Sequence, residues 1–301
     1  MDFGICIPHY GKPIDLQRIL GVAEHAEALG FASVWVTDHI LVPRTLEIIY
    51  RDHMLEPITL LSHLAAVVRR VRLGTSVIIL PYRSPILVAK MLATIDQLAH
   101  GRVIFGVGAG WMEPEFHALQ APFVERGALS DENLRIIRDC WSHETVSFQG
   151  RFHAYEDMQA SPRPVQPGGP PIWVGGNSAR SRRRVAELGD GWHSTGLSAA
   201  DMAPGCQHVR ELWTKNGRQG APVFSSRLAL FIDGVSHQVL SYPPRTPRAS
   251  VHGSIAAVVD QLGAFKALGL QHVVLETSTQ SHESTLATME ACMAHVKPQL
   301  D

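Results

Sequence analysis

A histidine beside an aspartate is the pair with the clearest chemical potential in this sequence. Asp38 and His39 follow residues 33–37, an apolar run typical of a buried strand. Because an imidazole titrates near neutral pH, His39 is a candidate proton donor or acceptor. The alternative is an aspartate that holds a loop and an incidental histidine, since the chain carries 16 histidines.

A pair of glycines ends another apolar run. Gly175 and Gly176 follow residues 172–174, and Asn177 and Ser178 then offer two good helix N-cap residues. Glycine lets the backbone approach a ligand, and the free N–H groups of a helix start bind anions. These four residues predict a site for a phosphate-sized anion. The alternative is a plain turn between a strand and a helix.

The helix predicted after Ser178 is unusually basic at its start, where cations face the positive end of the helix dipole. Arg180, Arg182, Arg183 and Arg184 fall in its first turns. A bound anion would offset this charge, and we expect Arg180, Arg183 and Arg184 to neutralise it. The alternative is a solvated basic face.

Small residues interrupt the apolar stretch 72–80. Thr75 and Ser76 there indicate either a bulge that admits a flat ligand or ordinary packing inside a barrel.

Glycines also alternate at the end of the next predicted strand, 103–107. Gly106, Gly108 and Gly110 reduce side-chain bulk where a ring could lie. Trp111 and Glu113 follow and are candidates for a substrate pocket. The alternative for Trp111 is that a neighbouring hairpin covers it.

Eight short apolar runs carry these residues and alternate with helical patterns along the chain. This alternation predicts a parallel sheet, and eight units favour a closed (β/α)8 barrel with its site at the C-terminal face. An open doubly wound sheet is the rival, but CIPHYGKP after the first run lacks GxGxxG. We expect one domain over 1–301, with an insertion at about 109–171 that contains a hairpin and an irregular cap at about 233–253. The runs are 3–7, 33–37, 72–80, 103–107, 172–174, 192–195, 223–232 and 272–276.

Composition excludes several classes of function. The net charge of −1 does not suggest nucleic acid or an acidic membrane as a partner. The four cysteines are scattered without a CxxC pair, so we expect neither disulfides nor a metal site. The motifs HExxH, Walker A and GxSxG are absent. We expect a cytoplasmic protein, because no signal-peptide pattern or membrane-length apolar run is present.

Taken together, the strand ends resemble the luciferase-like monooxygenase superfamily over essentially the whole chain. The resemblance rests on AEALGFASVWVTDHI, RLGTSVIILPYRSP, GRVIFGVGAGWMEPEF and PPIWVGGNSARSRRRVAELGDGW, in that order. The block GGNS…LGDGW is most similar to the branch that uses the deazaflavin coenzyme F420. Other branches use FMN.

The resemblance implies a cofactor at the barrel mouth, lying against a non-prolyl cis peptide at Ser76–Val77. His39 would be the catalytic residue, and Trp111 and Glu113 would line the substrate pocket. Sugar-phosphate dehydrogenases of this family pair the histidine with a glutamate after strand four, where this chain has Trp111, so the sequence argues against that reaction. The cofactor-binding residues implied are Asp38, His39, Thr75, Ser76, Val77, Gly108, Ala109, Gly110, Gly175, Gly176, Asn177, Ser178, Arg180 and Arg183.

The function implied is transfer of a hydride between coenzyme F420 and a small organic substrate, with hydrophobic character suggested by apolar and aromatic loop residues. An FMN-dependent monooxygenase is the first alternative. A deazaflavin-binding protein without catalytic activity is the second. The resemblance also implies a homodimer.

Overall fold

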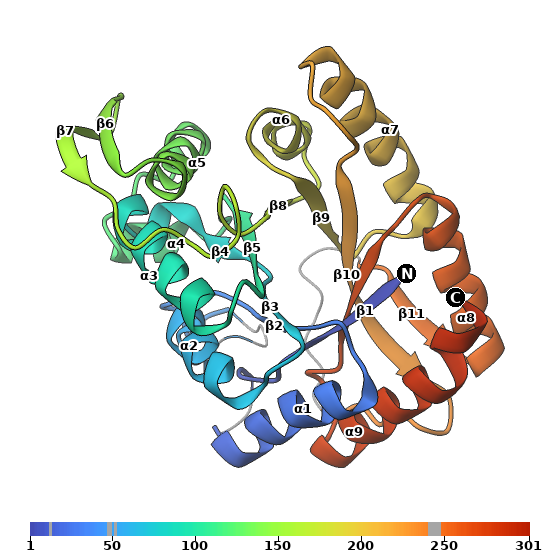
Figure 1. The fold of residues 1–301 in the computed structure, drawn as a ribbon. Helices are drawn as coiled ribbons and strands as arrows, with labels where there is room; N and C mark the ends of the chain where they lie inside the picture. Colours follow the sequence, from blue (N-terminus) through green and yellow to red (C-terminus); the bar gives the residue numbers. More distant parts are fainter. Residues whose placement is uncertain (12–13, 47–49, 51–52, 240–247) are drawn as a thin grey trace.

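The computed structural model describes residues 1–301 apart from 12–13, 47–49, 51–52 and 240–247. Parallel strands close into a barrel (Figure 1), because each pairs with its neighbours and β12 pairs back with β1. The predicted (β/α)8 barrel is confirmed. In order round the barrel, its strands are β1 (Asp2–Cys6), β2 (Ser33–Val36), β3 (Arg72–Thr75) with β4 (Ile78–Ile79), β5 (Val103–Gly108), β8 (Ile172–Gly175), β9 (Gly191–Thr195), β10 (Val223–Ile232) and β12 (His272–Glu276).

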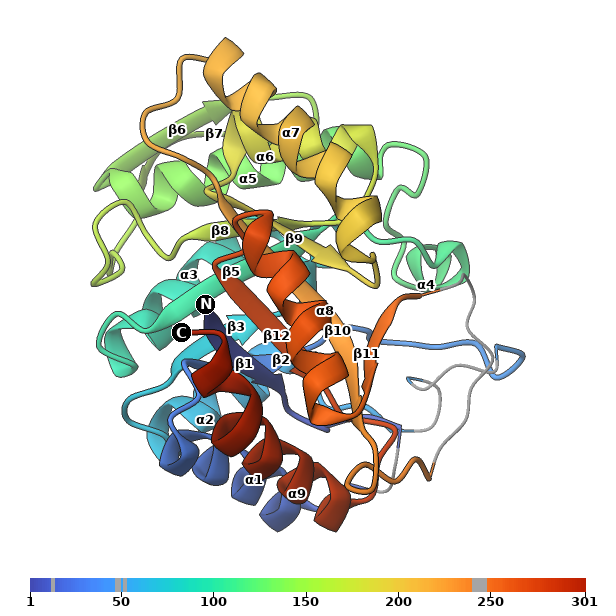
Figure 2. The same cartoon turned by 90° about the vertical axis from the view of Figure 1, so that its right-hand side faces the viewer.

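Helices cover the outside of the barrel (Figures 1 and 2). Local signals define their ends: the side chain of Asp15 caps the start of α1, and Gly30 closes it with a left-handed φ of 83°. The helices are α1 (Leu16–Leu29), α2 (Pro57–Val67), α3 (Pro85–Leu98), α5 (Arg126–Ser142), α6 (Ala179–Leu188), α7 (Ala199–Lys215), α8 (Ile255–Ala267) and α9 (His282–Ala291), which continues as a π-helical turn, Cys292–Val296, and a 3₁₀ turn, Lys297–Gln299.

The third barrel strand is broken in two. Residues 72–80 were expected to form one strand, but β3 and β4 are separated by Ser76 and Val77, and the peptide bond between these two residues is cis. The cis peptide that the resemblance implied is therefore confirmed. A 3₁₀ turn, Leu80–Tyr82, leads from β4 to α3.

The segment 109–171 is shared between the mouth of the barrel and its outer side. The short helix α4 (Glu113–Ala118) lies near the mouth, whereas α5 is itself a barrel helix that runs away from it. The antiparallel hairpin of β6 (Thr145–Gln149) and β7 (Ala154–Gln159) follows α5 and lies outside it (Figure 1). The hairpin predicted here is thus present, but it does not cover the mouth.

The cap expected at 233–253 falls partly outside the described residues, because 240–247 are among those excluded. Of the remainder, β11 (Ser250–Gly253) pairs in parallel with the end of β10.

Aromatic rings fill the barrel interior below the mouth. Trp35 stacks on His193 with ring centroids 5.1 Å apart and on Trp173 at 5.4 Å. Gly4 and Gly74 make room for Trp35, because a Cβ atom at either position would come within 2.5 Å of its indole. The interior below the mouth is therefore packed with side chains, as in other barrels of this type.

In the part of the chain that the structure describes, no helix is both long enough and apolar enough to span a membrane. The thiols of the four cysteines are free, and all four side chains are buried.

Candidate active site

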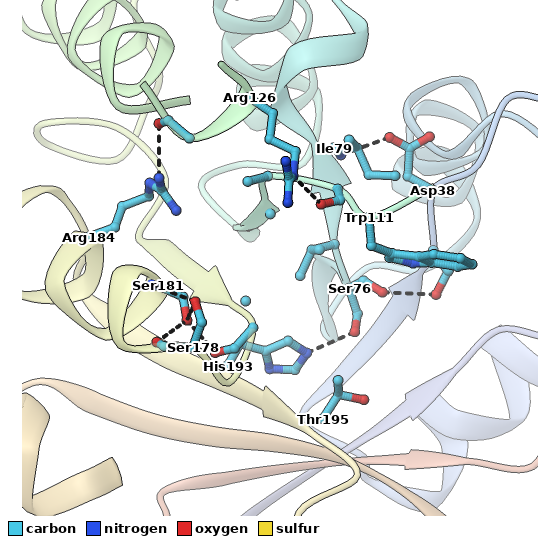
Figure 3. Close-up of a pocket in the computed structure, with 18 of the residues that line it drawn as sticks. Asp38, Ser76, Ile79, Trp111, Arg126, Ser178, Ser181, Arg184, His193 and Thr195 are labelled. Atoms are coloured by element: carbon cyan, nitrogen blue, oxygen red, sulfur yellow. Dashed lines mark hydrogen bonds between the residues drawn. The ribbon is translucent and has the colours of Figure 1, made fainter. Parts of the chain in front are cut away.

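A cavity of about 340 Å³ opens at the C-terminal ends of the barrel strands (Figure 3), and we call it the mouth cavity. Figure 3 shows Trp111 on one side of it and Ser178 and Ser181 across from it. Of the residues predicted for the site, those in its wall are Asp38, His39, Ser76, Val77, Gly108, Ala109, Gly110, Trp111, Gly175, Gly176, Ser178 and Arg180.

The cis peptide forms part of the cavity floor and is held from below. The Ser76 carbonyl accepts hydrogen bonds from Arg227 Nη1 and Thr37 Oγ1, both at 3.0 Å. The Ser76 hydroxyl lies 2.8 Å from His193 Nε2. The carbonyl and the hydroxyl of Ser76 are thus both hydrogen-bonded on the barrel side. This fixes the surface that the floor presents to a ligand.

The floor network is closed and largely buried. The guanidinium of Arg227 pairs with Glu276, with Nε–Oε2 at 2.8 Å, and donates to Tyr10 at 2.6 Å. Burial raises the pKa of the Glu276 carboxyl, but Arg227 outweighs this and lowers it to about 2. Burial, with the charge of Arg227, lowers the pKa of His193 to about 3. The histidine in the floor is therefore neutral at physiological pH.

The glycines of β5 and β8 make room for the broken strand. A Cβ at Gly106 would lie 1.7 Å from the Thr75 carbonyl oxygen, and a Cβ at Gly108 would lie 2.7 Å from the Val77 side chain. At Gly175 a Cβ would come within 2.9 Å of the same side chain. The interpretation that the alternating glycines directly admit a ring needs correction, because at Gly106 and Gly108 they admit the bulge that forms the floor.

His39 lies at the mouth beside aromatic residues and a buried carboxylate. Its Nδ1 is 2.7 Å from Glu115 Oε2. Its ring lies 4.8 Å from that of Tyr50 and 5.6 Å, edge to face, from that of Trp111. The imidazole is 94% buried, so few solvent molecules reach it.

The partners of Glu115 determine the tautomer of His39. The carboxylate of Glu115 also accepts the N–H groups of Ile40 and Leu41 and the Tyr82 hydroxyl. Burial raises the pKa of Glu115, but hydrogen bonds from His39 and these N–H groups outweigh it and lower the pKa. An ionised carboxylate can only accept, so Nδ1 of His39 carries the proton. In the neutral form of the ring, this tautomer has its lone pair on Nε2, which is the atom that can accept a proton.

Asp38 stabilises the local backbone, unlike its neighbour His39, whose ring lies beside other aromatic residues at the mouth. Its carboxylate accepts two hydrogen bonds from Arg83, at 2.6 and 2.9 Å, and one from the Ile79 N–H. Arg83 also donates to Glu56 at 2.7 Å. Because its oxygens are engaged in this way, Asp38 lines the mouth cavity but mainly fixes the loop that carries His39 and the start of β4.

The start of α6 has the backbone features expected of the predicted anion cradle. Ser178 is the N-cap residue and accepts the Ser181 N–H, and Gly176 has a left-handed φ of 101°. The Ser181 hydroxyl donates a hydrogen bond to the Gly176 carbonyl, which links the two ends of the turn. The remaining N–H groups of the first helical turn have no acceptor within the helix, as at every helix start. The cradle has the form of an anion site.

The arginines of α6 divide into two groups. Arg184 and Arg183 both pair with Asp131 on α5, at 2.5 and 3.2 Å. Arg182 donates to the Asn177 carbonyl at 2.8 Å. Among these four arginines, Arg180 is the one that lines the mouth cavity and forms no hydrogen bond or ion pair with the described residues. The expectation that Arg183 and Arg184 neutralise a bound anion is therefore corrected, because Asp131 already compensates them.

Two further cations that the sequence did not single out reach this cavity. Arg126, at the start of α5, donates to the carbonyls of Gly110 and Phe123 and lies over the Phe123 ring, 4.1 Å from its centroid. Arg248 packs over Gly196. Like Arg180, neither pairs with a carboxylate among the described residues. The mouth cavity is thus positively charged.

Four predicted site residues do not line the mouth cavity. Thr75 points into the barrel and donates to the Gly106 carbonyl. The Asn177 side chain is bonded to the Thr195 carbonyl, and Arg183 to Asp131. Glu113 is an exposed residue at the start of α4, near His117. The glutamate that bonds to a site residue is instead Glu115, two positions later, which is buried behind His39.

The described residues contain no group of three or more histidines, cysteines, aspartates or glutamates placed to hold a metal ion.

Comparison with known proteins finds relatives that depend on F420 and relatives that depend on FMNH2. An uncharacterized protein of Mycobacterium tuberculosis is 30% identical over 212 residues, 66% of this chain and 75% of that protein. The F420-dependent glucose-6-phosphate dehydrogenase of Kineococcus radiotolerans is 33% identical over 62% of this chain and 54% of that enzyme. The FMNH2-dependent dimethylsulfone monooxygenase of Pseudomonas putida is 31% identical over 55% and 46%.

Solved structures match the fold along its whole length. The monooxygenase RslO1 of Streptomyces bottropensis gives a TM-score of 0.85 at 22% identity, covering 100% of both chains. An F420-dependent secondary alcohol dehydrogenase gives 0.83 at 17% identity, covering 100% of this chain and 99% of the other. The model of the luciferase-like monooxygenase family matches residues 1–234. The chain therefore belongs to the luciferase-like monooxygenase family.

Proposed function

We propose that this protein is a coenzyme F420-dependent oxidoreductase that transfers a hydride between the deazaflavin and a small organic substrate. The observation that carries the proposal is the division of the mouth cavity. A proton acceptor, His39, lies beside Trp111. Arg180, which has no ion-pair partner among the described residues, lies at the anion cradle on the α6 side.

The residues present fit the two ends of this cofactor. Gly176, Ser178 and Ser181 form a cradle suited to a phosphodiester. Arg180, Arg126 and Arg248 provide three positive charges without carboxylate partners among the described residues. A single phosphate does not require so many cations, whereas the anionic oligoglutamate tail of coenzyme F420 extends beyond its phosphodiester and can use them.

The chain's own groups supply binding, orientation and proton transfer. When bound, the deazaflavin supplies or accepts the hydride. The rigid floor at Ser76–Val77 supports a flat ring, and the aromatic wall excludes water. Nε2 of His39 accepts the hydroxyl proton of an alcohol substrate, or returns it to a carbonyl oxygen in the reverse direction. Glu115 keeps the imidazole in the tautomer that this step needs.

An FMN-dependent monooxygenase is the second candidate, because the cradle at Gly176 and Ser178 suits one phosphate equally well. The relative from Pseudomonas putida uses FMNH2. Under this candidate, Arg126 and Arg248 would have no anionic partner in the cofactor.

Titration of the purified apo-protein with coenzyme F420 and, separately, with FMN tests the proposal. Binding is followed by fluorescence. We expect coenzyme F420 to bind at least tenfold more tightly than FMN. Tight binding of FMN with no binding of the deazaflavin would overturn the proposal and favour the monooxygenase.

A further inference from the structure

A second cavity of about 310 Å³ lies on the outer side of the barrel, and we call it the outer cavity. It lies between α3, α5 and the β6–β7 hairpin, and shares no lining residue with the mouth cavity. Figure 1 shows these three elements together at the edge of the molecule, away from the strand ends. Its wall is formed by Ile86, Ala89, Lys90, Ala93, Cys140, Trp141, Val146, Tyr155, Met158, Gln159, Ala160, Ser161 and Pro162.

The wall is apolar, and its strongest donors already have partners. The Trp141 indole N–H donates to the Ala89 carbonyl at 3.0 Å. The Lys90 ammonium donates to the Ser161 carbonyl at the edge of the cavity. No carboxylate is among the lining residues that the structure describes. The interior thus offers little to a charged ligand and suits a neutral one.

One buried hydroxyl in this wall has no oxygen or nitrogen partner among the described residues. It belongs to Tyr155, and only a sulfur atom lies within its reach. Its neighbour is the Cys140 thiol, which is a weak acceptor. Because a buried donor without an acceptor is costly, such groups usually meet a ligand or an ordered water. The Tyr155 hydroxyl therefore provides a single directional contact inside an apolar space.

The hairpin that closes the outer cavity is fixed in place. The Glu132 carboxylate on α5 accepts the N–H groups of Arg151, Phe152 and His153 at the hairpin turn, at 2.7–2.9 Å. The segment that follows β7 is bonded to α3, because Gln97 on that helix donates to the Arg163 carbonyl at 2.7 Å. These bonds hold the outer cavity open between packed elements, so a ligand would not have to order the hairpin to bind.

We propose that the outer cavity is a binding site for a small, neutral, mainly apolar molecule with one hydrogen-bond acceptor, which Tyr155 would contact. The volume of the outer cavity limits the size of this ligand. An apolar cavity of about 150 Å³ holds benzene. The outer cavity is twice as large and accommodates roughly two fused rings. This site is independent of the cofactor proposed for the mouth.

The proposal can be tested with 6-propionyl-2-(dimethylamino)naphthalene, a neutral probe of two fused rings and one carbonyl. Its emission shifts to the blue when it enters an apolar site. We expect saturable binding that Ala93→Leu abolishes by filling the outer cavity. Tyr155→Phe should raise the Kd by about tenfold, because it removes one hydrogen bond. Ala66→Leu, the same change on the exposed face of α2, is the matched control and should bind as the original chain does.

Two outcomes would overturn the proposal. If Trp111→Ala abolishes binding and Ala93→Leu does not, the probe occupies the mouth cavity. If Ala93→Leu instead changes the mass in sedimentation and leaves probe binding intact, the outer cavity is an interface between copies of the chain. Melting curves of all four variants show that each is folded, so a loss of binding in Ala93→Leu cannot be attributed to unfolding.

Discussion

The mouth cavity and the outer cavity are nearly equal in volume, about 340 and 310 Å³, but their chemistry is opposite. Residues far apart in sequence meet at the mouth because the C-terminal ends of all barrel strands converge there. It contains the imidazole of His39 and arginines that have no ion-pair partner among the described residues. The outer cavity is bounded by two helices and a hairpin, and the Tyr155 hydroxyl in its wall is buried without an oxygen or nitrogen partner among the described residues. Volume alone therefore does not identify a reactive site in this fold.

The mouth cavity also differs from top to bottom. Its floor is a closed network in which Arg227 and Glu276 compensate each other. Its rim carries Arg126, Arg180 and Arg248, none of which pairs with a carboxylate among the described residues. The floor is thus built for rigidity, whereas the rim has charge available for a ligand. The predictions below test these differences.

Acid should have the largest effect, through the barrel interior. Burial lowers the pKa of His9, His193 and His272 to about 3 from 6.5. The unfolded chain therefore takes up three protons between pH 6.5 and 3 that the folded chain does not. Their contribution to stability is complete above pH 6.5 and is lost as the pH falls, by up to about 4 kcal/mol per pH unit. Urea unfolding at pH 7, 6 and 5 measures this slope.

The variant His193→Gln should reduce the change of unfolding free energy per pH unit by about a third, because one of the three buried histidines is gone. No histidine is among the described residues that line the outer cavity, so substitutions there should leave the slope unchanged. A stability that stays constant from pH 7 to 5 would contradict the neutral state that we assign to the buried histidines.

The next largest effect concerns His39. Replacement by alanine should reduce turnover by about 10²–10⁴-fold, because it removes the proton acceptor. Cofactor affinity should change little. The measurement is the rate of deazaflavin turnover with any alcohol or carbonyl compound that the original chain accepts. Glu115→Gln should shift the pH profile of the rate, since the histidine tautomer is then no longer fixed. Unchanged turnover in His39→Ala would contradict this role, because the reaction would then not need the His39 imidazole.

Breaking the floor network should destabilise the whole protein. Arg227→Met leaves Glu276 buried and unpaired, which typically costs about 3–5 kcal/mol. The double variant with Glu276→Leu should recover most of this loss. As a matched change at the outer cavity, Lys90→Met removes an exposed hydrogen bond and should cost about 1 kcal/mol or less. Equal losses in urea unfolding for the two single variants would contradict the difference between the two regions.

The smallest effect separates two arginines on the same helix. Arg180→Glu should weaken coenzyme F420 binding by about tenfold or more, because Arg180 lines the mouth cavity and no described residue forms an ion pair with it. Arg183→Glu should change it far less, since this side chain is exposed and pairs with Asp131. Fluorescence titration of both variants gives the comparison. Equal weakening would mean that the overall charge of the helix, rather than contact in the cavity, controls affinity.

Much of the fold could be predicted from local patterns. Strands buried on both faces and helices with one apolar stripe follow from the spacing of apolar residues, and their alternation favours a barrel. The break at Ser76–Val77 was predicted only through the resemblance, because small residues within a strand also suit ordinary packing. The route of the 109–171 segment was missed, since α5, with its high content of charged residues, was grouped with the loop around it.

The missed parts of the site depend on contacts between distant residues. Glu113 and Glu115 are both plausible in EPEF, and only the direction of α4 brings Glu115 to His39, 76 positions away in sequence. Likewise, Asp131 compensates Arg183 and Arg184 from a neighbouring helix. A sequence reveals that a cation is present, but the packing of helices decides whether it is available for a ligand.

The most direct test of the account compares coenzyme F420 with the same deazaflavin lacking its phosphate and glutamate tail. Both are titrated into the unmodified protein by fluorescence at one ionic strength, since salt screens exposed charge. We predict that the compound without phosphate and tail binds at least tenfold more weakly, because the cradle at Ser178 and the arginines at the rim lose their partners. Equal affinity for the two compounds would contradict it and leave these arginines as surface charge.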